Sequence, residues 1–99
     1  MERDEVSTRR YMQKVPGKRV QIGVRMEMRM VKVLKALAEY DDMSLGELLE
    51  GVVLHVFERK LPFSEETLKV VAQFKAAYGM DYDASASHQF QEPARDSDE

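Results

Sequence analysis

The sequence predicts a mainly α fold, with one short strand and three amphipathic helices assembled as an intertwined homodimer. Residues 18–26 alternate apolar and polar side chains, which is the period of a β-strand. The remainder of the chain shows helical apolar stripes and no second strand. We therefore expect the strand to pair with its copy in another chain, as an intermolecular two-stranded antiparallel β-ribbon.

The composition indicates a soluble globular chain with one small domain and two tails. Hydrophobic residues make up 43% and charged residues 33% of the 99 positions, which disfavours wholesale disorder. The absence of cysteine excludes disulfides and thiolate metal sites. No apolar run approaches the ~20 residues that span a membrane, and no secretion signal follows the charged start. We expect a cytoplasmic protein.

The net charge of −3 conceals a basic N-terminal third and an acidic remainder. Residues 1–35 carry ten Lys and Arg against four Asp and Glu, whereas residues 36–99 carry five against fourteen. No acid occurs between Glu5 and Glu27. A concentrated basic segment favours nucleic-acid binding more than the overall charge opposes it.

The predicted elements divide the chain into four parts. Residues 1–17 form a flexible basic arm, and residues 18–60 form a dimerisation domain with a strand at 18–26 and helices at 27–40 and 45–59. Residues 61–79 add a third helix at 65–78, and residues 80–99 form an acidic tail that we expect to be disordered. Ser44 and Glu47 match a capping box, Ser64 opens the third helix and Gly79 closes it. No good capping residue precedes the first helix.

The strand and the first two helices are too short to bury a sufficient core alone, which favours a two-fold dimer. We expect the apolar face of the strand and the stripes of the two helices to form the shared core. This dimer core comprises Val20, Ile22, Val24, Met26, Leu34, Leu37, Leu48, Leu49, Val52, Val53, Val56 and Phe57.

Residues 18–60 resemble the ribbon-helix-helix family, the MetJ/Arc type of bacterial DNA-binding repressors. The resemblance rests on the alternating strand, the ungapped distance to Leu37 and Ala38, the short turn, and the Ser44 cap before a second apolar stripe. It implies a sequence-specific repressor whose dimeric ribbon enters the major groove of double-stranded DNA, often as a dimer of dimers on one operator.

The resemblance also implies which residues contact DNA. The outward side chains of the strand, Gln21, Gly23 and Arg25, would read bases, although Gly23 departs from the usual polar residue. Arginine suits guanine and glutamine suits adenine. Phosphates would be held by the strand end, by the start of the second helix and by the arm. These residues are Lys18, Arg19, Ser44, Leu45, Gly46, Arg9, Arg10 and Lys14.

Other functions remain open. Family members also include antitoxins and plasmid-partition regulators, in which a C-terminal extension or an N-terminal arm binds a protein partner. Residues 61–99 are long enough to bind such a partner. A dimeric adaptor without DNA binding is a further alternative, favoured by the net negative charge and by Gly23. We expect no enzyme, because the sequence lacks a phosphate loop, a nucleophile elbow and a zinc-ligand pattern. His55 and His88 form no metal motif, and we expect no cofactor.

Overall fold

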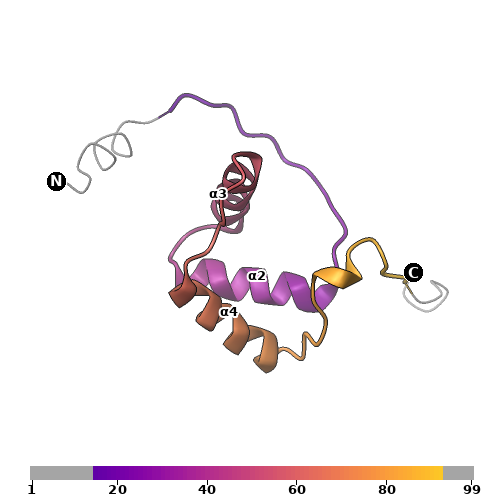
Figure 1. Cartoon of the computed structure of the whole chain (residues 1–99). Coiled ribbons are helices and arrows are strands. Elements are labelled where there is room, and N and C mark those ends of the chain that lie inside the picture. The colour runs from indigo at the N-terminus through magenta and orange to yellow at the C-terminus, as the bar shows by residue number, and fades with distance from the viewer. Residues whose placement is uncertain (1–14, 93–99) are drawn as a thin grey trace.

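A computed structural model describes residues 15–92, in which three helices follow an outstretched N-terminal segment (Figure 1). The helices are α2 (Met28–Tyr40), α3 (Leu45–Phe57) and α4 (Glu65–Ala77), each of 13 residues, and a single 3₁₀ turn, η1 (Ala84–Ala86), follows. The mainly α prediction is confirmed, and the predicted helices agree with the observed ones to within two residues at every end.

Each long helix begins at a side chain that accepts hydrogen bonds from free backbone N–H groups. Ser44 and Glu47 form the predicted capping box of α3, and the Ser64 hydroxyl accepts from the N–H of Thr67 in α4. The cap of α2 was not predicted: the Glu27 carboxylate accepts from the backbone N–H of Arg29 and of Met30, at 2.9 and 3.3 Å. Glutamate is an uncommon N-cap. The Glu27 side chain is also held by a hydrogen bond from the hydroxyl of Tyr82.

All three helices end in the same hydrogen-bonded turn, in which a residue with positive φ reverses the chain. That residue is Asp42 after α2, Arg59 after α3 and Gly79 after α4. In each case the next N–H reaches back five residues, as when Met80 donates to the carbonyl of Lys75 at 2.8 Å. This is the Schellman arrangement, and Gly79 has the predicted capping role.

The core of the described chain lies where α3 and α4 pack against α2. Val33, Leu37 and Ala38 of α2 and Leu48 of α3 are buried. Partly buried side chains surround the cluster formed by Leu37, Ala38 and Leu48: Leu34, Leu45, Val52, Phe63, Val70 and Val71. The third predicted helix, α4, therefore covers the first helix of its own chain, and the Tyr40 and Phe74 rings meet edge-on at 6.3 Å.

The predicted ribbon-helix-helix fold is wrong for the described residues, because residues 15–92 contain no β-strand and hence no two-stranded antiparallel ribbon. Residues 15–27 run outstretched to the start of α2 without secondary structure (Figure 1). A strand is defined by hydrogen bonds to a neighbouring strand. Alternating side chains predict an extended backbone, but they do not supply the neighbour.

Residues 15–92 contain no helix with the length and apolar character needed to cross a membrane.

Candidate nucleic-acid interface

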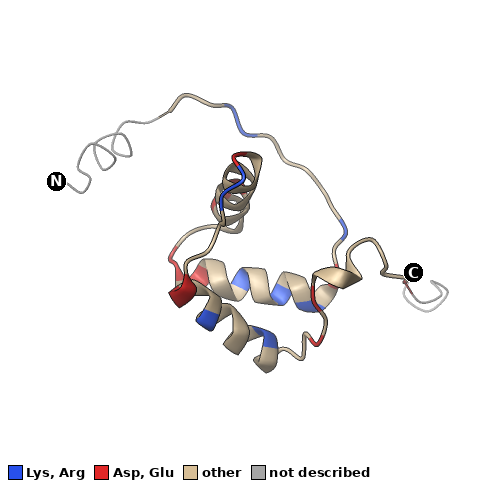
Figure 2. Cartoon of the chain, in the orientation of Figure 1, with Lys and Arg blue, Asp and Glu red and all other residues tan. Residues whose placement is uncertain are grey.

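The outstretched segment comprises residues 15–26, and every one of these residues is exposed. Lys18, Arg19 and Arg25 are its described basic residues, and Figure 2 shows further Lys and Arg along α2, into which it runs. The apolar side chains that alternate with them are exposed as well, with Ile22 at 73%. The segment thus presents cations and uncovered apolar groups together. The predicted phosphate contacts Arg9, Arg10 and Lys14 lie outside the described residues.

Arg19 is held by α3. Its Nε and Nη2 atoms donate to the two carboxylate oxygens of Glu50, at 3.1 and 2.6 Å. This is the forked geometry in which arginine also binds a phosphate. The hydrogen bond to Glu50, followed by the charge of its carboxylate, raises the pKa of Arg19.

Arg25 is held in the same way by Glu92, in the C-terminal part of the described chain. Its Nε donates to Glu92 Oε2 at 3.0 Å, and its Nη2 donates to Glu92 Oε1. Both side chains are more than half exposed, at 67% and 54%, so the pair faces solvent. The predicted base-reading arginine therefore contacts an acid 67 residues later in the sequence.

The two other predicted base-reading positions, Gln21 and Gly23, lie between these arginines and are exposed. A Cβ atom added at Gly23 would meet nothing within 4 Å. Neither a close contact nor a left-handed backbone conformation therefore requires glycine at this position.

The start of α3, predicted to bind a phosphate through Ser44, Leu45 and Gly46, already carries the protein's own carboxylate. Glu47 Oε1 accepts from the Ser44 N–H at 2.9 Å, and the Ser44 hydroxyl accepts from the Glu47 N–H at 3.1 Å. The hydrogen bond from the Ser44 backbone is the main reason that the pKa of Glu47 is lowered. A phosphate there would meet a stably ionised glutamate, which opposes the predicted contact.

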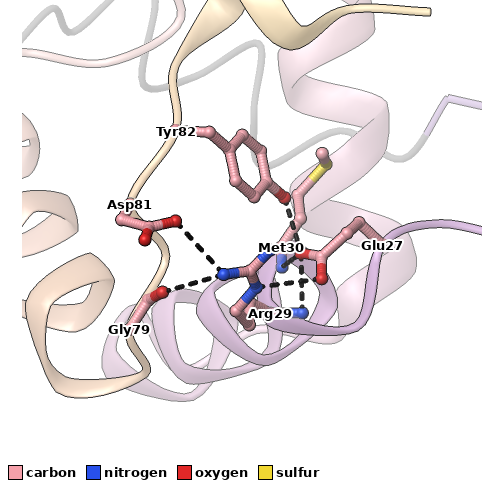
Figure 3. A network of polar contacts seen from close by, with 6 residues as sticks. All are labelled: Glu27, Arg29, Met30, Gly79, Asp81 and Tyr82. Carbon is pink, nitrogen blue, oxygen red and sulfur yellow. Dashed lines mark hydrogen bonds and ion pairs between the residues drawn. The ribbon is translucent and has the colours of Figure 1, made fainter. Parts of the chain in front are cut away.

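A polar network that the sequence did not predict joins the base of the segment to the C-terminal region (Figure 3). The Tyr82 hydroxyl donates to Glu27 Oε1 at 2.7 Å, and Arg29 Nε donates to Glu27 Oε2 at 3.0 Å. Arg29 Nη1 also lies 3.2 Å from both the Gly79 carbonyl oxygen and Asp81 Oδ1. The Arg29 guanidinium lies 5.2 Å from the centre of the Tyr82 ring, close enough for a cation–π contact.

The network shifts the pKa values of its two central groups in opposite directions. Burial, followed by the hydrogen bond to Glu27, raises the pKa of Tyr82 to about 12. The hydrogen bond from Tyr82, followed by that from Arg29, lowers the pKa of Glu27. Glu27 is therefore ionised and Tyr82 protonated at neutral pH, which are the states that their hydrogen bond requires. No sequence pattern predicts this hydrogen bond, because Tyr82 and Glu27 are 55 residues apart.

The residues predicted to form the dimer core fall into two groups in the single chain. Leu37 and Leu48 are buried by the chain's own helices, and Leu34, Leu49 and Val52 are half-buried. The others are exposed: Val20, Ile22, Val24, Met26, Val53, Val56 and Phe57. Leu54, which was not predicted, is 61% exposed beside them on α3. We call Val53, Leu54, Val56 and Phe57 the open face of α3.

The described residues hold no group of three or more His, Cys, Asp or Glu side chains that could bind a metal ion. His55 is engaged within its helix, where Nδ1 lies 2.7 Å from the Gly51 carbonyl oxygen.

Comparison of the chain with protein-family models, with curated proteins and with solved structures finds no match.

Proposed function

We propose that the chain is a sequence-specific DNA-binding protein and acts as a transcriptional repressor in the form of a homodimer. The observation that carries the proposal is the outstretched segment of residues 15–26, which has no acid of its own and exposes Lys18, Arg19 and Arg25. An exposed chain can follow the surface of a duplex without rearranging the helices. The expected compartment is the cytoplasm.

Electrostatics favour a polyanionic partner. The positive charges of the segment continue into α2, where Lys32 and Lys35 are exposed (Figure 2). Arginines that form forked contacts with carboxylates can transfer the same two donors to a phosphate or to the O6 and N7 atoms of guanine. In this proposal Arg25 and Gln21 read bases, while Lys18 and Arg19 bind the DNA backbone.

The exposed apolar residues favour a second copy of this chain as the protein partner. The open face of α3 and the apolar side chains of the segment are uncovered in the single chain. Burying one valine or phenylalanine side chain contributes about 1.5–3 kcal/mol. Two-fold symmetry brings identical faces together and doubles every such contact. It would also place two basic segments in one assembly, where two half-sites of an operator can be bound.

The test is selection from random duplex DNA with the purified full-length protein, followed by affinity measurements across a salt series. We expect a recovered consensus sequence, and a fall in log K with log salt with a slope of about −0.9 per phosphate contacted. Failure to retain any duplex at low salt would overturn the proposal.

A dimeric adaptor without a DNA role is the second candidate, because Glu50 and Glu92 already bind Arg19 and Arg25, the two arginines of the outstretched segment. The same experiment separates the two functions. An adaptor would dimerise through the open face of α3, retain no DNA and show no salt-dependent affinity for a duplex.

A further inference from the structure

The C-terminal segment of residues 79–92 returns to the point where the outstretched segment enters α2 (Figure 1). The Schellman turn at Gly79 directs the chain away from α4, and the contacts of Gly79, Asp81 and Tyr82 with the start of α2 then hold it (Figure 3). Farther along, the Phe90 ring meets the Tyr82 ring edge-on, with centres 4.9 Å apart. The return path is therefore fixed by several side chains rather than by one ion pair.

This path places Glu92 on Arg25. The carboxylate accepts from both Nε and Nη2 of the guanidinium, which are two of the donors that a forked contact with guanine or phosphate uses. A guanidinium edge bound to a carboxylate cannot bind DNA through the same edge. Occupation of Arg25 by Glu92 and by DNA is therefore mutually exclusive in this geometry.

We propose that the C-terminal segment is an autoinhibitory element, in which Glu92 competes with DNA for Arg25 while Tyr82 anchors the segment at the base of α2. The inference rests on the proposed function and adds its regulation. DNA binding would displace Glu92, and any protein partner that captured residues 83–92 would raise the affinity for DNA.

The size of the inhibition follows from the exposure of the ion pair. Since Arg25 and Glu92 are both more than half exposed, their attraction is screened and the competition is mild. The apparent dissociation constant equals the intrinsic constant divided by the fraction of molecules in which Arg25 is free of Glu92. Removing the carboxylate with Glu92→Gln should tighten DNA binding about two- to five-fold.

A matched control separates competition from the general effect of deleting one negative charge. Glu58 is an exposed acid at the end of α3, and it pairs with Lys60 at 3.3 Å. Glu58→Gln therefore removes the same charge and also breaks an exposed ion pair, but away from Arg25. We expect Glu58→Gln to change the affinity by less than half the effect of Glu92→Gln. Equal effects of the two variants would overturn the inference.

A double-mutant cycle in the full chain tests whether the effect acts through Arg25. In an Arg25→Gln background, Glu92→Gln should tighten DNA binding by no more than Glu58→Gln does, because the competed group is absent and only the general effect of charge remains. A gain in that background as large as in the parent would overturn the inference.

A measurement without DNA distinguishes failure of this inference from failure of the proposed function. In the free protein, exchange of the Arg25 Nε proton with water, followed by NMR, should be faster in Glu92→Gln than in the parent and unchanged in Glu58→Gln. Equal exchange rates in the parent and in Glu92→Gln would overturn the inference even if the protein binds DNA. If no variant binds any duplex at low salt, the proposed function and the inference built on it both fail.

Discussion

The helical body, formed by α2, α3 and α4, and the outstretched segment of residues 15–26 both carry apolar residues in regular patterns. Only the helical body buries apolar side chains. Leu37 of α2 is 1% exposed, whereas Ile22 of the segment is 73% exposed. The stripe of α2 packs against α3 and α4 of the same chain, whereas the apolar side chains of the segment stay exposed within residues 15–92. A regular apolar pattern therefore indicates that a side chain needs a partner, but it does not indicate which chain provides that partner.

The first prediction tests the packing of the helical body and has the largest expected change in stability. Leu37→Ala should lower the free energy of unfolding by about 2–5 kcal/mol, because it leaves a cavity at the centre of a small core. Urea unfolding followed by circular dichroism measures this change. Leu61→Ala, at an 87% exposed position, is the matched control and should change stability by less than about 0.5 kcal/mol. A cost below about 1 kcal/mol for Leu37→Ala would show that the body is not packed as described.

The second prediction tests the segment. Arg25→Ala should weaken binding to the selected duplex by about 1–3 kcal/mol and relax the preference at one base pair, since it removes a two-donor contact. Its unfolding free energy should stay within about 0.5 kcal/mol of the parent value, because Arg25 is exposed. Lys18→Ala is the contrast: it should weaken all sequences alike and make the salt slope shallower by about one phosphate. If Arg25→Ala bound every sequence as the parent does, base reading by Arg25 would be refuted.

The third prediction asks whether a second copy covers the apolar groups that the body leaves open. Phe57 is 77% exposed on the open face of α3. Phe57→Ala should raise the dimer dissociation constant by at least about tenfold, because truncating a central aromatic residue at an interface commonly costs more than about 1 kcal/mol per copy. Sedimentation equilibrium over a concentration series measures the change. A parent protein that remains monomeric at high concentration would exclude the proposed dimer.

The smallest effect concerns the junction between the two regions. Tyr82→Phe should lower the free energy of unfolding by about 1–2 kcal/mol at pH 8, because it removes a hydrogen bond to the ionised Glu27. Tyr40→Phe, which keeps the ring against Phe74, is the control and should cost less.

The raised pKa of Tyr82 adds a pH signature to this variant. Because the folded-state pKa lies above the ordinary value of 10.0, at about 12, the stability contributed by protonated Tyr82 is complete below about pH 10. That stability is then lost as the pH rises from about 10 to 12. The difference between the parent and Tyr82→Phe should shrink over this range, and a constant difference would contradict the assignment.

The elements that could be predicted from the sequence are those whose signals are local. The three helices, the Ser44 and Ser64 caps and the Gly79 turn follow from spacing and residue type within one or two turns of the chain.

Contacts between residues far apart in the sequence could be identified only from the folded structure. It brought Tyr82 to Glu27 and Glu92 to Arg25, contacts that span 55 and 67 residues and leave no periodic trace in the sequence. It also showed that α4 packs on α2, and that the alternating segment of residues 18–26 has no strand beside it in the described chain. Helices satisfy their backbone hydrogen bonds within a few residues, whereas a sheet and a fold-back contact depend on distant groups whose positions only the packed chain defines.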